Sequence, residues 1–295
     1  MWLPVVVLLL PALGETSLRE VEKLIAAGRF PQARQALEDV PRGSAHRHLL
    51  ASKIYDGLND PGRAVEEAEA ALAIDPRQEA YHLQLGQIFL ARNTPQAAAE
   101  VFEEALRLFP DSLLLRLGNG IALKNLMRYE DAERQLRQCL QRQPGFPLAF
   151  DELATVLLLQ KRFEDVRGLA DQYRAAHPAD YRGFYFAAAA REKAGEPAIE
   201  SLISESIRLN PNFAAAQALL GKVRLESGRA AEAIAPLERA LQLRPDYTPA
   251  ALHLAQAYRR AGRRADADRA LQLLRELKDK ESRPAPALRY HRGKR

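Results

Sequence analysis

The chain has 295 residues, of which 47% are hydrophobic, 27% charged and 7% aromatic, a composition that can bury a core and favours packed helices over sheets. The formal net charge is +5, but residues 259–295 contain 13 Lys or Arg against 5 Asp or Glu, so the rest of the chain is slightly acidic. A single cysteine, Cys139, excludes an intramolecular disulfide framework and a zinc site built from cysteines.

Residues 1–14 (MWLPVVVLLLPALG) form an apolar run without a charged side chain. The run is shorter than the roughly 20 residues that span a bilayer, and it is typical of a secretory signal with Ala12-Leu13-Gly14 as the cleavage pattern. It lacks the usual Lys or Arg, so a short anchor or a hydrophobic lead-in helix is the alternative. We expect a signal peptide, no transmembrane span after its removal and an exported protein, periplasmic or secreted, with a cytoplasmic protein as the fallback.

A pattern of about 34 residues recurs from residue 15 to about residue 281. Its fullest copy, residues 79–112, has bulky and small side chains at fixed offsets: His82, Leu85, Gly86, Phe89, Ala98, Phe102, Ala105 and Pro110. The apolar positions have helical spacing, and Gly86 and Ala98 are small where two helices must approach closely. Pro110 cannot continue a helix. The pattern therefore predicts a helical hairpin.

The copies follow one another without long interruptions. They cover residues 15–44, 45–78, 79–112, 113–146, 147–180, 181–213, 214–247 and 248–281. Six of them end in a proline at the same position, at residues 76, 110, 144, 178, 211 and 245. One hairpin cannot bury its apolar face alone, so we expect an all-α stack of about eight hairpins.

These spacings resemble the tetratricopeptide repeat, with His82 in the place of the family's tryptophan. The resemblance implies a right-handed α–α superhelix, a solenoid over residues 15–281 in which the first helix of each hairpin lines a concave groove. The charged outer face of residues 265–280 suits a terminal cap. Residues 282–295 have Pro, Gly and positive charge but no apolar period, and we expect a disordered basic tail.

In repeats of this kind, positions 2, 5, 9 and 12 point into the groove. By this resemblance the predicted peptide-binding groove contains Leu49, Lys53, Leu83, Gln87, Leu117, Ile121, Lys124, Asp151, Thr155, Arg182, Tyr185, Lys222, Gln256 and Arg259. The same positions also hold Leu114, Leu148, Glu192 and Leu252. An apolar stripe in a solvent-facing groove indicates a partner; the alternative is that these leucines pack against neighbouring helices.

The resemblance implies a scaffold that binds a protein or peptide segment, in envelope assembly, secretion or a pilus-type machine. The family's clamp for a terminal carboxylate uses Lys at position 5 and Asn at position 9, a pair that no repeat here has. An extended or helical ligand with apolar anchors is therefore expected. The alternatives are an accessory subunit of an enzyme complex, or polyanion binding through residues 259–295. Nucleic acid is not expected, because Tyr290 is the tail's one aromatic residue, and self-association stays open.

No catalytic motif or cofactor loop is present, so we expect a protein that is not an enzyme and has no cofactor or metal. His46 and His48 lie about 200° apart on a helix and cannot share one metal ion. Cys139 occupies a slot that holds alanine in sister repeats, which predicts a buried thiol. Asp266 and Asp268 lack the Gly and Glu of a calcium loop and suit a solvated helix start.

Overall fold

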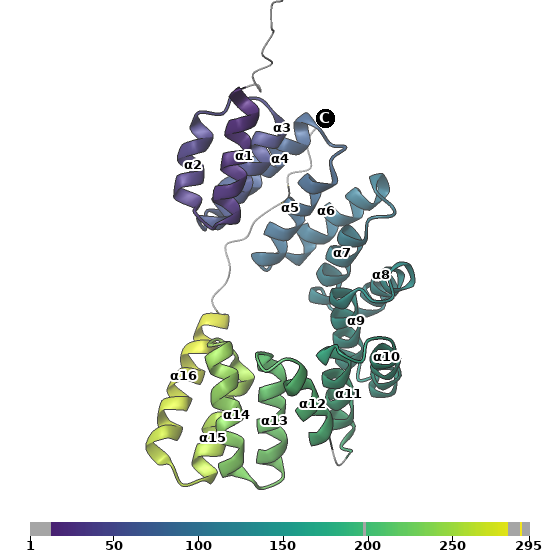
Figure 1. The fold of residues 1–295 in the computed structure, drawn as a ribbon, viewed down its shortest axis with the longest axis vertical. Coiled ribbons are helices and arrows are strands. Elements are labelled where there is room, and N and C mark those ends of the chain that lie inside the picture. The colour runs from purple at the N-terminus through teal and green to yellow at the C-terminus, as the bar shows by residue number, and fades with distance from the viewer. Residues whose placement is uncertain (1–12, 197–198, 283–289, 291–295) are drawn as a thin grey trace, which may run out of the picture. The chain divides into compact units, whose positions relative to one another are not determined.

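The computed structural model describes residues 13–196, 199–282 and Tyr290, and every regular element in these residues is an α-helix (Figure 1). The helices are α1 (Leu13–Ala26), α2 (Phe30–Glu38), α3 (Ala45–Gly57), α4 (Pro61–Ile74), α5 (Glu79–Ala91), α6 (Pro95–Leu108), α7 (Leu113–Asn125), α8 (Tyr129–Arg142), α9 (Pro147–Leu159), α10 (Phe163–Ala176), α11 (Tyr181–Ala194), α12 (Glu200–Leu209), α13 (Ala214–Glu226), α14 (Ala230–Leu243), α15 (Thr248–Arg260) and α16 (Arg264–Ser282). They form eight consecutive pairs, so the predicted all-α fold of about eight hairpins is confirmed.

Contacts divide the chain into two compact units. Among the described residues, the first unit contains residues 13–135 and Tyr290, and the second contains residues 136–196 and 199–282. The boundary falls inside α8, between Gln135 and Leu136, so the predicted solenoid over 15–281 is seen as two sets of hairpins. Most of the predicted leader (1–14) and tail (282–295) lies outside the described residues, and the boundaries of both stay predictions.

Every hairpin turn contains one residue in the left-handed backbone region, with φ between 53° and 78°. The eight residues are Gly28, Asn59, Asn93, Met127, Lys161, Gly195, Gly228 and Gly262. The next residue donates its backbone N–H to a carbonyl five residues earlier, as from Arg29 to Leu24 at 2.8 Å. This is the Schellman arrangement, which satisfies carbonyls at a helix end. Four of the eight are glycines, which adopt this backbone without a steric penalty, and two are asparagines, which tolerate it better than most residues, so the backbone hydrogen bond recurs even where Met127 or Lys161 occupies the position.

The connections between hairpins are equally regular. Each predicted terminating proline lies two residues beyond the end of a second helix, as Pro110 follows Leu108 of α6. Some of the following first helices begin with a side-chain cap: Ser112 accepts from the backbone N–H of Leu115 at 3.1 Å. The prediction that these prolines end the second helices is therefore confirmed.

The ring of Phe102 on α6 lies between two glycines on the adjoining first helices. A Cβ atom on Gly86 of α5 would lie 2.3 Å from the Phe102 Cζ atom, and one on Gly118 of α7 would lie 2.5 Å from it. Phe102 is fully buried. The close packing of α5, α6 and α7 thus requires the absence of both side chains, which confirms the role predicted for Gly86.

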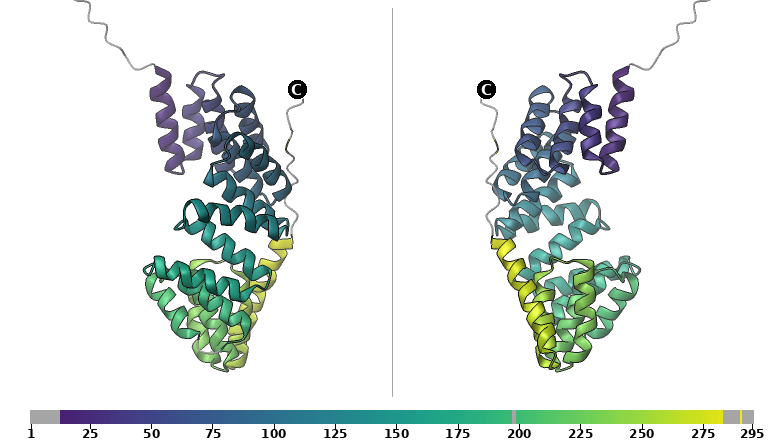
Figure 2. Two further views of the ribbon diagram at one scale, coloured as in Figure 1. Left: turned by 90° about the vertical axis from the view of Figure 1, so that its right-hand side faces the viewer. Right: turned by 90° about the vertical axis from the view of Figure 1, so that its left-hand side faces the viewer.

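Within each unit the first helices form one continuous layer. In the first unit α3 contacts α1 and α5, and α5 contacts α7; in the second, α11 contacts α9 and α13, and α13 contacts α15. The second helices pack against the first helices before and after them, as α14 does between α13 and α15. The longest helix, α16, covers α15 at the end of the second unit (Figure 2).

We predict that Gly86→Ala lowers the stability of the protein, because Phe102 must move from a packed site, at a cost on the order of 1–3 kcal/mol. Gly168 in the interior of α10 has no atom within 4 Å of its potential Cβ position. Gly168→Ala should therefore raise stability by about 1 kcal/mol through helix propensity. Calorimetric unfolding of both variants measures the two effects; equal shifts of the same sign would contradict this account.

Candidate functional site

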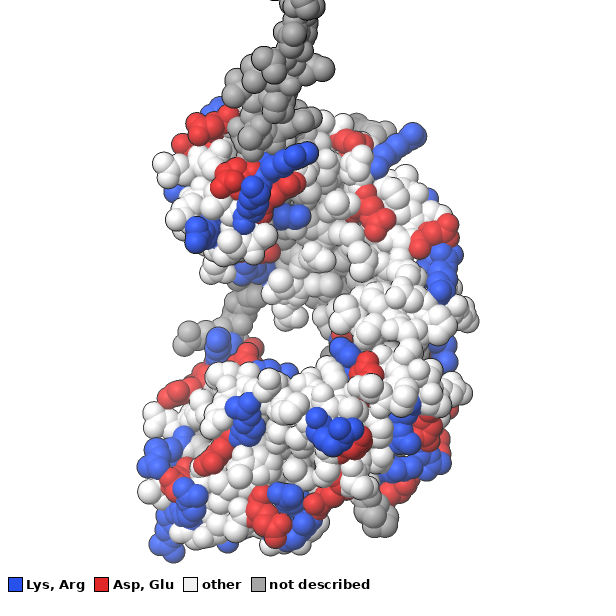
Figure 3. Space-filling model, viewed as in Figure 1, with Lys and Arg blue, Asp and Glu red and all other residues white. Residues whose placement is uncertain are grey.

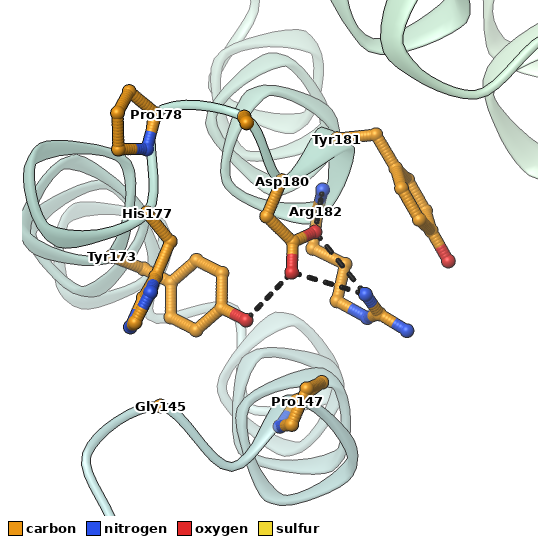
Figure 4. A pocket seen from close by; sticks show the side chains of 9 residues that line it. Gly145, Pro147, Tyr173, His177, Pro178, Asp180, Tyr181 and Arg182 are labelled. Atoms are coloured by element: carbon orange, nitrogen blue, oxygen red, sulfur yellow. Dashed lines mark hydrogen bonds and ion pairs between the residues drawn. The ribbon is translucent and has the colours of Figure 1, made fainter.

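The layer of first helices in the second unit brings together charged residues from different hairpins. Arg182 on α11 donates its Nε–H to Asp151 Oδ2 on α9 at 3.0 Å. Its Nη1 also donates to both carboxylate oxygens of Asp180, at 3.2 and 3.1 Å. The hydroxyl of Tyr173 donates to Asp180 Oδ2 at 2.9 Å (Figure 4). One guanidinium therefore holds two carboxylates, and the position of Arg182 is fixed from both sides.

Local sequence explains how this network forms. Asp180 caps the start of α11, where its side chain accepts from the backbone N–H of Arg182 at 3.0 Å. Tyr173 stands in a second-helix slot where sister repeats hold Ala71, Ala105, Cys139 and Ala240. Its ring stacks on Phe150 with centroids 3.8 Å apart, and its hydroxyl thereby reaches the loop that precedes α11.

These side chains line an open pocket of about 560 Å³ at the ends of α9, α10 and α11 (Figure 4). Gly145, Pro147, His177, Pro178, Ala179 and Tyr181 complete its wall. His177 lies against the Tyr173 ring, with centroids 4.6 Å apart. Tyr173, Asp180 and Arg182 are bonded to one another within the pocket wall, so their polar groups are largely satisfied by the chain itself.

Asp151 has an incompletely satisfied carboxylate. Burial raises the pKa of Asp151 to about 6; the hydrogen bond and charge of Arg182 oppose this rise, and the charges of Asp180 and Glu152 add to it. The Oδ1 atom is buried and has no hydrogen-bond partner. Such an acceptor is costly to leave unpaired, so a donor on a bound segment would be favoured here.

Further along the same layer of first helices, aromatic and charged side chains also lie next to one another. Tyr185 on α11 lies edge-on to Phe213, with ring centroids 4.9 Å apart, and burial raises the pKa of its hydroxyl. About two turns on, Glu192 forms an ion pair with Lys222 of α13. Burial alone would lower the pKa of Lys222, but the hydrogen bond and the charge of Glu192 oppose this effect, and the pKa is raised overall. The predicted residues of α9, α11 and α13 are thus neighbours in space.

Figure 3 shows Lys and Arg interspersed with Asp and Glu over the visible face of the second unit. Many of these charges pair within one helix, as Arg208 does with Glu205 at 2.6 Å. The second unit therefore presents mixed charge on this face rather than a patch of one sign.

The structure changes the set of predicted groove residues at two positions. Leu49 and Leu117 are only 4% and 6% exposed, so they are packing residues and the prediction that they face a ligand is corrected. Leu49 lies in a cluster with Ala45, Ala71 and Tyr81, which takes up its side chain. The exposed apolar groups of the row are instead Leu114, Leu148 and Leu252, at 51%, 52% and 37%.

The other predicted residues differ in accessibility. Gln87 and Arg259 are exposed, and the remaining ones are half-buried: Lys53, Leu83, Ile121, Lys124, Asp151, Thr155, Arg182, Tyr185, Lys222 and Gln256. Thr155 donates its hydroxyl to the backbone carbonyl of Asp151 at 2.8 Å. Sequence reasoning missed Tyr173, Asp180 and Phe213, and the bulk of Tyr173 at a small-residue slot was the available signal.

Residues that could suggest chemistry have structural roles. His46 pairs with Glu22 and His48 with Glu67, each on its own side of α3. His82 is buried and its Nε2 lies 3.0 Å from the Pro76 carbonyl. Cys139 is fully buried, as predicted. In the part of the chain that the structure describes, no cluster of three His, Cys, Asp or Glu could hold a metal ion, and no helix is long and apolar enough to cross a bilayer.

The raised pKa of Asp151 predicts a pH-dependent effect of Asp151→Asn. The folded state favours the protonated acid, so the stability it contributes is present below the ordinary pKa of 3.8 and is lost as pH rises through about 6. Asparagine avoids this loss. Relative to wild type, the variant should gain on the order of 1 kcal/mol between about pH 4 and about pH 7.5, a figure reduced for the 32% exposure of the side chain.

Urea unfolding of the second unit at the two pH values measures this gain. Asp171→Asn makes the same charge change at an exposed position of α10 and serves as the control. A gain of equal size in both variants would show that the environment of Asp151 is not its cause.

Comparison with known proteins adds sequence and fold relationships. Two family models, both described as tetratricopeptide repeat, match residues 224–289 and residues 49–112 and 194–248. Together they cover more than half of the chain. No curated protein matches the chain.

Solved structures share the fold. A tetratricopeptide repeat protein from Parabacteroides merdae has a TM-score of 0.70 and 14% identity, over 82% of this chain and 98% of that one. PilW, described as a widely conserved type IV pilus biogenesis factor, has a TM-score of 0.60 and 21% identity, over 72% and 99%. A chain of the APC/C hetero-tetramer Cut9–Hcn1 has a TM-score of 0.60 and 18% identity over 82% of this chain, which spans about half (49%) of that one. Because the repeat matches and the stacked hairpins agree, the chain belongs to the tetratricopeptide repeat family.

Proposed function

We propose that this chain acts without catalysis, as a scaffold that holds a protein or peptide segment against its layer of first helices. Tetratricopeptide repeats support protein interaction in general. The observation that carries the finer proposal is on α9, where the exposed Leu148 precedes Asp151 by three residues and so shares its helix face. Asp151 carries the unpaired carboxylate oxygen. An apolar anchor and a hydrogen-bond acceptor thus stand next to each other.

The chemistry of this face defines the ligand. Leu148 favours an apolar side chain, and Asp151 Oδ1, once a bound segment displaces the side chains that cover it, favours a backbone N–H or a basic side chain one turn away. Arg182 is already ion-paired with Asp151 and Asp180, so it has no unpaired positive charge to offer an acidic ligand. We therefore propose an extended or helical segment with apolar anchors and a donor, and no partner with a free terminal carboxylate at this position.

A matched pair of leucines in the second unit tests the proposal. Leu252 on the first helix α15 and Leu271 on the second helix α16 are both 37% exposed. We expect Leu148→Glu and Leu252→Glu to weaken capture of the partner from the source cell about tenfold or more, as loss of an interface anchor does. Leu271→Glu should leave capture unchanged.

The measurement is a quantitative pull-down with the mature chain, followed by titration of the captured protein and circular dichroism of each variant. Equal loss in Leu252→Glu and Leu271→Glu at unchanged helix content would argue against the layer of first helices as the binding surface. Full capture by all three variants would do the same.

We also propose that the chain is exported and serves in envelope assembly or secretion. The apolar run of residues 1–14 and its small-x-small end support export. PilW, a pilus biogenesis factor by its description, shares the fold at 21% identity, which is in keeping with such a setting but assigns no partner. We predict that the mature protein begins at Glu15. N-terminal sequencing of the chain from its source cell checks this, and an N-terminus at Met1 would count against cleavage.

A further inference from the structure

Tyr290, near the end of the chain, has a defined place on the first unit. Its hydroxyl donates to Glu104 Oε2 of α6 at 3.0 Å. Its ring meets the ring of Phe89 on α5 edge-on, with centroids 6.2 Å apart at 71°. It also packs against the core cluster that these helices share. Between residues 283 and 295, Tyr290 is the one residue that the structure describes, and the prediction of a disordered tail for residues 282–295 stays untested.

The site under Tyr290 has both an apolar floor and a polar rim. Phe89 is fully buried with the Tyr290 ring in place, and Ala98, Val101 and Phe102 of the same cluster are also fully buried. Glu104 is half-buried and accepts the phenol hydrogen, so both ends of the tyrosine are satisfied. A hydrogen bond to a charged acceptor is stronger than one between neutral groups. This arrangement distinguishes tyrosine from phenylalanine.

Charge complementarity points to the same occupant. Residues 283–295 contain five basic residues and no acidic one: Arg283, Arg289, Arg292, Lys294 and Arg295. Two second helices of the first unit, α4 and α6, are acidic, with Glu66, Glu67 and Glu69 on α4 and Glu100, Glu103 and Glu104 on α6, against Arg63 and Arg107. A basic segment is thus attracted to these helices by long-range electrostatic forces, and the contacts of Tyr290 fix the position at which it binds.

We propose that the α5–α6 hairpin carries a docking site for the chain's own C-terminal segment, with Tyr290 as its anchor and Glu104 as the acceptor. The site uses Glu104 of a second helix and Phe89 of the first helix α5, but none of Leu148, Asp151 and Leu252, so it does not depend on the function proposed for the layer of first helices. Docking in the same molecule benefits from a high effective concentration, so a modest intrinsic affinity is enough to keep the segment bound.

The test uses the full chain with Tyr290→Ala, which vacates the site, and a fluorescein-labelled peptide of residues 283–295. We expect saturable binding by fluorescence anisotropy, and binding about tenfold weaker to the wild-type chain, whose site is occupied. In the Tyr290→Ala background, Glu104→Gln should weaken binding about tenfold through loss of the charged acceptor. Glu103→Gln makes the same charge change next to it and should leave binding within about twofold.

Peptides with Phe or Ala in place of Tyr290 complete the experiment. The Phe peptide should bind several-fold more weakly than the native one, and the Ala peptide should not saturate. Equal binding of native and Ala peptides, or equal effects of Glu103→Gln and Glu104→Gln, would reduce the interaction to non-specific charge attraction and overturn the proposal. Equal binding by wild-type and Tyr290→Ala chains, or concentration-dependent dimers of the wild type that Tyr290→Ala abolishes, would overturn docking within one molecule.

Discussion

The fold depends on helices that approach so closely that a large side chain of one helix fills the space left where its neighbour has a glycine. Phe102 takes up the space beside Gly86 and Gly118, and Leu237 does the same beside Gly221, where a Cβ would lie 2.4 Å from Leu237 Cγ. Such contacts repeat because each hairpin alone leaves an apolar face uncovered. The left-handed turn residue and the backbone hydrogen bond of the next residue then reverse the chain in each hairpin.

The candidate site arises where a repeat departs from this regular pattern. Tyr173 fills a slot that is small in sister repeats, and through Asp180 it is connected to Arg182 and Asp151 of neighbouring first helices. Most polar groups of this network bond to one another, but the Oδ1 atom of Asp151 has no hydrogen-bond partner. Regular helix packing therefore forms the surface. Tyr173, which departs from the repeat pattern, sets the arrangement of the charged side chains on it.

The two proposed surfaces use different residues in different hairpins. A ligand on the first helices meets leucines and the Asp151 carboxylate, whereas Tyr290 meets the α5–α6 hairpin through Glu104 of a second helix. In these two proposals, the layer of first helices binds a foreign segment while another site holds the chain's own C-terminal segment. The basic tail, which by composition suits a polyanion, has through Tyr290 a partner within its own first unit.

The sequence by itself determined the number, length and order of the hairpins, because proline position, glycine position and apolar period are local properties of the chain. Pro110, Gly28 and Gly86 did what their chemistry predicted. Only the tertiary structure decided which members of the predicted row are accessible. Leu49 and Leu252 occupy the same position in their repeats, yet Leu49 is buried against Tyr81 and Leu252 is 37% exposed, because burial depends on the neighbouring hairpin. The contact of Tyr290 with Phe89 could not be predicted from the sequence either, because the two residues are 201 positions apart and no local pattern relates them.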